Sequence, residues 1–169
     1  MRIRVFGVVQ DSIVDGPGLR TAVFVQGCSH RCPGCHNPGS HDPAGGREMD
    51  TADILAAMAH NPLCAGLTLS GGEPFEQAAP CLALARGAHA LGKTVWAYTG
   101  YTLEALRASA DPSVAALLAE ADVLVDGPYL EAQRSLELKF RGSKNQRLID
   151  LKQSTPEQTV LWHDPWEAL

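Results

Sequence analysis

Three closely spaced cysteines constrain this chain more than any other feature, and they lie in the stretch GCSHRCPGCHN at residues 27–37. Three residues separate Cys28 from Cys32, and two separate Cys32 from Cys35. A disulfide framework favours an even number of cysteines, and a structural zinc site favours four ligands in two knuckles. The spacing instead predicts three ligands of an iron–sulfur cube, whose fourth iron is left open for a substrate. A zinc knuckle or an inert loop is the alternative.

Length and composition predict a single domain over residues 1–169, long enough to bury a core. The apolar content of 45% and charged content of 20% are globular values, and the net charge of −5 argues against a nucleic-acid partner. No apolar run is long enough for a membrane span and no export leader is visible, so we expect a cytoplasmic protein with no membrane partner. Cys64 and Cys81 lie beside alanine and leucine, which predicts ordinary core side chains.

Hydrophobic patterning predicts alternating strands and helices along the chain. Buried strands are predicted at 21–26, 67–69, 94–98 and 123–125, and helices at 51–59, 80–91, 103–108 and 112–120. Residues 1–6 are predicted as a short edge strand, 37–48 as loop and 147–151 as an additional strand. This alternation implies right-handed crossovers and a parallel sheet, with too few strands for a closed eight-fold barrel. The expected fold class is α/β, an open partial (β/α) barrel of parallel strands with the cysteine loop after the first core strand.

Polar and glycine-rich segments follow the predicted strands at their carboxyl ends. They are the cysteine loop, the SGGEP sequence at 70–74, Thr99 and Asp126. Because the carboxyl ends of parallel strands meet at one edge, we expect these segments to share one rim of the sheet. The two glycines of SGGEP lack a Cβ and allow close approach to a ligand, although a plain turn is the alternative. Turn initiation is the alternative for Thr99 and Asp126.

These motifs in combination resemble the radical S-adenosylmethionine superfamily. Within it, the DGPGLR sequence at 15–20 and the GC and CHN flanks of the cysteines look like the glycyl-radical-enzyme activases. The sequences DVLVDGPY at 122–129 and LKFRGSKNQRLID at 138–150, with the short length, are similar to the anaerobic ribonucleoside-triphosphate reductase-activating proteins. The resemblance covers nearly the whole chain up to about residue 150.

The resemblance implies a 4Fe–4S cluster held by Cys28, Cys32 and Cys35, whose open iron chelates the amino and carboxylate groups of S-adenosylmethionine. The reduced cluster would cleave that cofactor to methionine and a 5′-deoxyadenosyl radical. This radical would take a hydrogen from a glycine Cα of the partner, the anaerobic ribonucleotide reductase. A flavodoxin or ferredoxin is the expected electron donor.

The resemblance also implies where the cofactor binds. Gly72 and Glu73 would contact its methionine amino group, and Thr99 and Asp126 its carboxylate or ribose, directly or through a cation. His36 would lie near the cluster or the adenine, although an ordinary loop histidine is as plausible, and His30 is expected to be exposed. Gly34 stands where many members of the superfamily carry an aromatic residue, which leaves the adenine contact open. The implied cofactor-binding set is Gly34, His36, Gly71, Gly72, Glu73, Thr99 and Asp126.

Three alternatives remain open from the sequence. The radical could serve another substrate, either a different glycyl-radical enzyme, such as a pyruvate formate-lyase-like partner, or a small molecule. A ferredoxin-like electron carrier is a hypothesis from another class, but no suitably spaced fourth cysteine supports it. The tail motif at 141–147 suits cofactor binding, partner docking or a structural turn.

Overall fold

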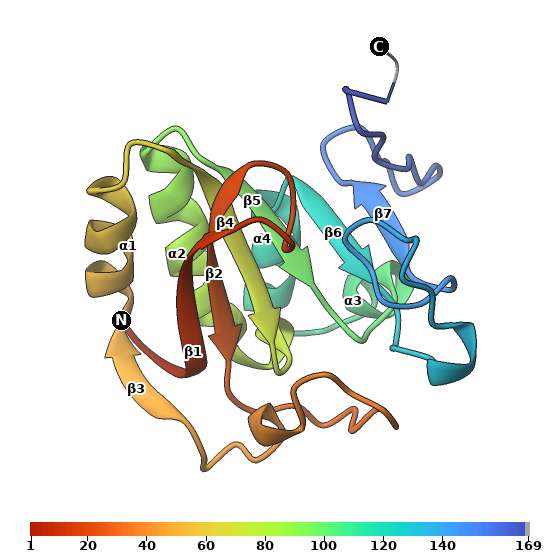
Figure 1. Cartoon of the computed structure of the whole chain (residues 1–169), viewed down its shortest axis with the longest axis horizontal. Coiled ribbons are helices and arrows are strands. Elements are labelled where there is room, and N and C mark those ends of the chain that lie inside the picture. Colours follow the sequence, from red (N-terminus) through yellow and green to blue (C-terminus); the bar gives the residue numbers. More distant parts are fainter. Residues whose placement is uncertain (168–169) are drawn as a thin grey trace.

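An open seven-stranded sheet forms the centre of the computed structural model, which describes residues 1–167 (Figure 1). In chain order the strands are β1 (Arg2–Ser12), β2 (Leu19–Val25), β3 (Arg47–Asp50), β4 (Cys64–Gly71), β5 (Thr94–Tyr98), β6 (Val123–Asp126) and β7 (Arg147–Asp150). In space their order is β3-β1-β2-β4-β5-β6-β7.

The four middle strands β2, β4, β5 and β6 run parallel, as predicted. Across them, Val23 pairs with Leu69, Leu69 with Ala97, and Ala97 with Leu124. All four side chains are fully buried, which is typical of parallel strands covered on both faces. The parallel strands bring their carboxyl ends to one edge, at the lower side of Figure 1.

Antiparallel strands extend the sheet at both edges, and two predictions about them are wrong. Residues 1–6 are not an edge strand, because β1 runs for 11 residues and lies between β2 and β3. Strand β3 begins within the predicted loop, and there Glu48 lies within ion-pair distance of Arg2 and Arg4. So short and charged a strand has no apolar alternation that would predict it. The additional strand near 147–151 is confirmed as β7.

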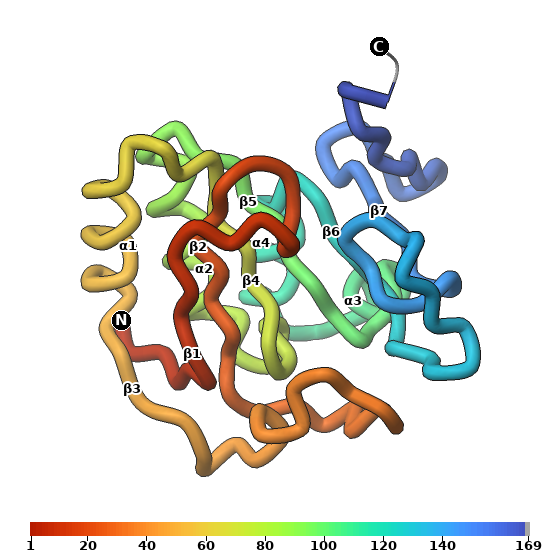
Figure 2. The backbone as a smooth tube through the Cα atoms, viewed as in Figure 1, coloured from red at the N-terminus to blue at the C-terminus, as the bar shows by residue number. Residues whose placement is uncertain are grey.

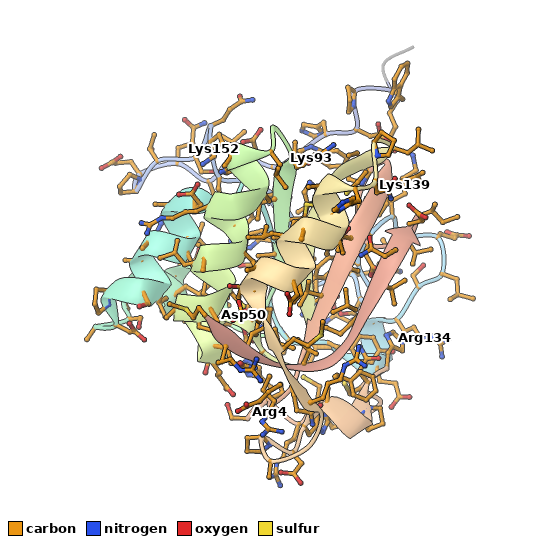
Figure 3. All side chains as sticks on the ribbon, turned by 90° about the vertical axis from the view of Figure 1, so that its left-hand side faces the viewer. Arg4, Asp50, Lys93, Arg134, Lys139 and Lys152 are labelled. Atoms are coloured by element: carbon orange, nitrogen blue, oxygen red, sulfur yellow. The ribbon has the colours of Figure 1, made fainter. Side chains whose placement is uncertain are left out.

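The four predicted helices are confirmed as α1 (Thr51–Ala59), α2 (Ala78–Ala90), α3 (Leu103–Arg107) and α4 (Pro112–Glu120), with short turns η1 (Pro38–Ser40), η2 (Pro74–Gln77) and η3 (Glu131–Gln133). Asp50 and Asp111 cap α1 and α4 by accepting hydrogen bonds from backbone N–H groups. Helices α1, α2 and α4 lie side by side on one face of the sheet (Figure 3). None of the described helices is long and apolar enough to cross a membrane.

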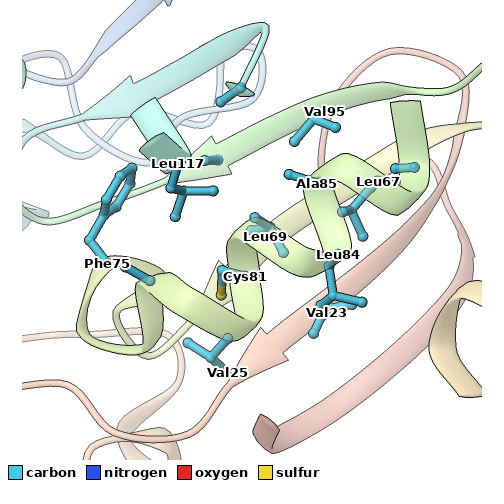
Figure 4. Packing of buried hydrophobic residues seen from close by; sticks show 14 of the residues in the cluster. Val23, Val25, Leu67, Leu69, Phe75, Cys81, Leu84, Ala85, Val95 and Leu117 are labelled. Atoms are coloured by element: carbon cyan, nitrogen blue, oxygen red, sulfur yellow. The ribbon is translucent and has the colours of Figure 1, made fainter. Parts of the chain in front are cut away.

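The main core lies between these helices and the sheet (Figure 4). Cys81, Leu84 and Ala85 of α2 are fully buried and belong to one cluster with Leu67 and Leu69 of β4. The other core cysteine of the sequence analysis, Cys64, is 3% exposed. Both cysteines are therefore confirmed as core side chains.

The C-terminal segment packs beside β7 and against the other face of the sheet (Figure 2). The Trp162 ring meets Trp96 of β5 edge to face at a centroid distance of 4.9 Å, and Phe140 meets Trp96 at 5.4 Å. Leu161 forms a bridge to Ile149 of β7. The chain after β7 therefore closes a small aromatic cluster.

His89 joins the end of α2 to the segment between α4 and β6. Its ring nitrogens lie 2.7 Å from Glu120 Oε1 and 2.9 Å from Asp122 Oδ2. Partial burial lowers the pKa of His89, but the hydrogen bonds to the two carboxylates outweigh this and raise the pKa overall. The resulting stabilisation is complete below the unfolded-state pKa of about 6.5 and is lost as the pH rises through the folded-state pKa.

We therefore expect His89→Gln to lower the free energy of unfolding by about 1 kcal/mol near pH 6, and by less near pH 9. Urea denaturation at both pH values measures this difference. The exposed His60 provides a control, because His60→Gln removes no ion pair. A gap between wild type and His89→Gln that does not change with pH would contradict the assignment.

Candidate metal and cofactor site

A cavity of about 300 Å³ opens at the carboxyl edge of the parallel strands. Its walls come from the cysteine loop after β2, the glycine turn after β4, the end of β5 and the turn after β6. The three loop cysteines, Gly71, Gly72 and Thr99 are among its lining residues. The expected gathering of these segments at one rim is therefore observed.

The three loop cysteines are free, partly buried and face this cavity. Burial raises the pKa of the Cys28 thiol, while the backbone N–H groups of His30 and Arg31 act on it in the opposite direction. No three His, Cys, Asp or Glu side chains among residues 1–167 converge on a single metal ion. The thiolates of an iron–sulfur cube bind separate irons and need not converge on one point. This arrangement is therefore compatible with three thiols that bind separate irons of a cube.

Backbone hydrogen bonds fold the cysteine loop back on itself. The Gly27 N–H donates to the Ser40 carbonyl at 2.7 Å, and the Cys28 N–H donates to the His41 carbonyl at 3.1 Å. Gly27 has a φ of +99°, a conformation that glycine adopts readily. The first ligand of the predicted cluster thus begins directly after a glycine turn at the end of β2.

Gly71 and Gly72 let the turn after β4 approach the cysteine loop closely. Gly71 has a φ of +91°, and a Cβ there would lie 2.5 Å from Phe24 Cα. The Gly72 N–H donates to the Val25 carbonyl at 2.8 Å. A Cβ on Gly72 would collide with the Gly27 carbonyl oxygen and lie 2.9 Å from its carbon. Both positions therefore require glycine, and both face the cavity.

The Glu73 carboxylate is fully buried and is not among the residues that line the cavity. It accepts hydrogen bonds from Thr99 Oγ1 at 2.9 and 3.0 Å, from the Gly100 N–H at 2.9 Å and from the Phe75 N–H at 3.1 Å. It also lies 2.7 Å from His30 Nε2. A buried carboxylate needs such partners because desolvation is costly. In this structure Glu73 therefore stabilises the turn after β4 by hydrogen bonds to the end of β5 and to Phe75.

The expectation that His30 is exposed is wrong. Its side chain is 17% exposed and its ring packs edge to face on Tyr101 at a centroid distance of 4.4 Å. The hydrogen bond to Glu73 raises the pKa of His30, although partial burial opposes the shift. Its polar partner lies 43 residues away in sequence, so no local pattern predicts this contact.

Asp126 is the last residue of β6, at the predicted rim, but it does not line the cavity. Its carboxylate is 1% exposed, pairs with the Arg147 guanidinium and accepts the Leu103 N–H at 2.8 Å. Arg147 also pairs with Glu104, and these two pairings raise the pKa of Arg147. In this structure Asp126 therefore belongs to a group of ion pairs that joins β6, β7 and α3.

Of the remaining predicted residues, His36 lines the cavity and Gly34 does not. The His36 ring lies 5.0 Å from the Tyr129 ring. Gly34 has a φ of +74°, and a Cβ there would lie 2.8 Å from the Glu131 carboxyl carbon. Gly34 is therefore constrained by its positive φ and by the nearby side chain of Glu131 in η3.

The cavity also includes residues that the sequence analysis missed. Tyr98 and Tyr129 line it, as do His41 and Gln146. Tyr98 directly precedes Thr99 at the end of β5, and this position could have predicted that Tyr98 lines the cavity. In the described part of the chain, His41 Nε2 is buried without a hydrogen-bond partner. No local signal pointed to His41.

The tail motif at 141–147 forms a turn that contributes to the cavity wall. The Arg141 guanidinium donates to the carbonyls of Lys144, at 3.2 Å, and Gln146. The Gln146 amide oxygen accepts the N–H groups of Gly142 at 3.0 Å and Ser143 at 3.2 Å. The structural turn considered for this motif is therefore present, with Gly142 and Gln146 facing the cavity.

Comparisons with known proteins agree with this site. A family described as "4Fe-4S single cluster domain" matches residues 14–149. The anaerobic ribonucleoside-triphosphate reductase-activating protein of Salmonella typhi is 39% identical over 151 residues, which cover 83% of this chain and 94% of that protein. The proteins of the same name from Vibrio cholerae and Enterobacteria phage T4 are 38% and 35% identical, covering 79% and 80% of this chain and 89% and 86% of theirs.

The chain belongs to the anaerobic ribonucleoside-triphosphate reductase-activating protein family. Residues 14–149 include the cysteine loop and the glycine turn, so the cavity lies within the part that matches the 4Fe-4S single cluster domain. The aromatic contact made by Trp162 lies beyond the matched residues.

We expect Gly72→Ala to displace the cysteine loop in this member of the family. The added Cβ meets the Gly27 backbone, so the turn and the loop must separate. The free energy of unfolding should fall by about 1–3 kcal/mol, and iron binding after anaerobic reconstitution should weaken. Gly7→Ala is the matched control, because a Cβ at Gly7 meets nothing within 4 Å. Equal effects of the two substitutions would contradict the close-approach argument.

Proposed function

We propose that this protein is a radical S-adenosylmethionine activase that generates a glycyl radical on anaerobic ribonucleotide reductase. The observation that carries the proposal is that three free thiols and a glycine cradle face one cavity, in a chain of the reductase-activating family. When bound, the 4Fe–4S cluster and S-adenosylmethionine supply a reductive carbon–sulfur cleavage that ends in hydrogen-atom abstraction from a glycine.

The chain's own residues hold and orient these groups in this proposal. Cys28, Cys32 and Cys35 are the cluster ligands, because thiolate is a soft ligand suited to iron. Backbone groups of Gly71 and Gly72 receive the methionine end of the cofactor, since no side chain separates them from the cavity.

The other predicted site residues are proposed to contact the cofactor or to position the loops around it. His36 and Thr99 line the wall and are proposed to contact the cofactor. Glu73 and Asp126 act indirectly through their hydrogen bonds, and Gly34 through its backbone conformation. No side chain is required as a general base, because the step is a hydrogen-atom transfer.

A protein substrate suits the surroundings of the cavity. A second cavity of about 390 Å³ shares Asp15, His36, Tyr98 and Gly142 with the first. Its lining includes Ile13 and Val14, each 70% exposed. Such exposed apolar side chains beside a site support contact with a polypeptide. A flavodoxin or ferredoxin is the proposed electron donor.

Further proposals concern the chain as a whole. We propose one activase domain over residues 1–169, with the sheet curved as an open partial barrel. A cytoplasmic location is consistent with free, unpaired thiols, because that compartment keeps cysteines reduced.

Electron paramagnetic resonance of the anaerobically reconstituted, reduced protein tests the proposal. The cluster signal should change when S-adenosylmethionine is added, and incubation with the reductase should then yield a glycyl radical signal. A cluster signal indifferent to S-adenosylmethionine would overturn the activase in favour of an electron carrier. A glycyl radical formed only on a pyruvate formate-lyase-like protein would show that such a protein, and not the anaerobic reductase, is the partner.

A further inference from the structure

Two carboxylates of the turn after β4 hold two neighbouring residues of the cysteine loop. Glu73 lies 2.7 Å from His30 Nε2, and Glu76 accepts hydrogen bonds from the hydroxyl and the N–H of Ser29. The carboxylates are three residues apart around the single-turn helix η2, and in such a helix residues i and i+3 share a face. Ser29 and His30 lie between the first two cysteines, so this contact fixes the segment that carries Cys28.

The structure contains a slot built for the His30 ring. Gly100 forms one wall, because a Cβ there would lie 2.5 Å from His30 Cδ2. The Tyr101 ring packs edge to face on the imidazole at 4.4 Å, and its hydroxyl lies 3.3 Å from Glu76. The fully buried Glu73 carboxylate forms the base of the slot. The cysteine loop is thereby held by the ends of both β4 and β5.

We infer that His30 is a positioning residue that, by binding the buried Glu73 carboxylate, fixes the cysteine loop for cluster binding. This inference deepens the proposed function and rests on it for the cluster. The clasp itself, defined as the contact of His30 with Glu73 and Gly100, is a property of the chain alone. It therefore has a test that requires no cluster.

Hydrogen–deuterium exchange of the metal-free protein provides that test. In His30→Ala, exchange in residues 28–36 should become several-fold faster, while helix α2 keeps the wild-type rate. His30→Gln should restore slow exchange, because the glutamine amide can still donate to Glu73. Gly100→Ala should reproduce His30→Ala, because its Cβ occupies the ring's slot. His60→Ala, at an exposed histidine, should leave the loop unchanged.

Unchanged exchange in His30→Ala, or no rescue by His30→Gln, would overturn the clasp. Faster exchange across α2 as well would also overturn it, because the effect would then be general unfolding.

The iron and sulfide content of the reconstituted protein tests the consequence for cluster binding. His30→Ala should bind less cluster than wild type, His30→Gln should bind more than His30→Ala, and His60→Ala should match wild type. Unchanged cluster content in His30→Ala, with the loop loosened, would overturn the role in cluster binding. If wild type binds no cluster but the loop depends on His30, the proposed function fails and the clasp stands.

Discussion

Cys32→Ala is expected to abolish stable cluster binding and to reduce cleavage of S-adenosylmethionine by more than about 100-fold. Loss of partners outside the ligand shell already costs roughly 10- to 100-fold in metal affinity or activity, so loss of a ligand should cost more. Cys32 is the middle cysteine of the loop and lines the cavity. Iron and sulfide content after anaerobic reconstitution, followed by detection of 5′-deoxyadenosine, measures both effects.

Cys81→Ala is the matched control for this substitution. Cys81 is fully buried in α2 and lies in the apolar core. Its replacement should lower the free energy of unfolding by about 1 kcal/mol through lost packing and leave cluster content unchanged. Full cleavage activity in Cys32→Ala would disprove the ligand assignment. Loss of the cluster in both variants would show that general stability, rather than ligation, controls cluster binding.

Arg20→Ala is expected to lower the free energy of unfolding by about 3–5 kcal/mol, the largest stability effect we predict. Arg20 is 1% exposed, and its guanidinium donates to Thr68 Oγ1 and the Leu67 carbonyl, both at 2.8 Å, and to Thr94 Oγ1 at 3.0 Å. It also lies over the Trp96 ring at 5.7 Å. Burial lowers its pKa to about 10, so it remains charged at neutral pH. The substitution would leave these acceptors unpaired around a new cavity.

Urea-induced unfolding measures this effect, and Arg86→Ala serves as its control. The Arg86 side chain is 64% exposed and lies 3.9 Å from Glu120, so its loss should change stability by no more than about 0.5 kcal/mol. Arg20→Lys keeps the charge but not the planar fork and should therefore remain clearly destabilising. If Arg20→Ala were as mild as Arg86→Ala, the network would contribute nothing to stability.

Much of the fold follows from short-range patterns. The apolar runs of β2 and β5 and the aspartate caps of α1 and α4 were readable because strand burial, helix periodicity and capping depend on residues a few positions apart. Strand β3 was missed because its four residues are mostly charged and find their partners in β1, far away in sequence. The position of the site was also predictable, because the carboxyl ends of parallel strands meet at one edge of the sheet.

The sequence by itself predicted the candidate site residues, from the cysteine spacing and the glycines of the turn after β4, and predicted the alternation of strands and helices that gathers them at one rim. Only the tertiary structure decided which way Glu73 and Asp126 face. A carboxylate after a strand has the same local pattern whether it enters a cavity or turns inward. Its direction depends on partners such as His30, 43 residues from Glu73, and Arg147, 21 residues from Asp126. Folding brings these partners close to the carboxylates. Each carboxylate then turns toward its partner, because burying an unpaired carboxylate is costly.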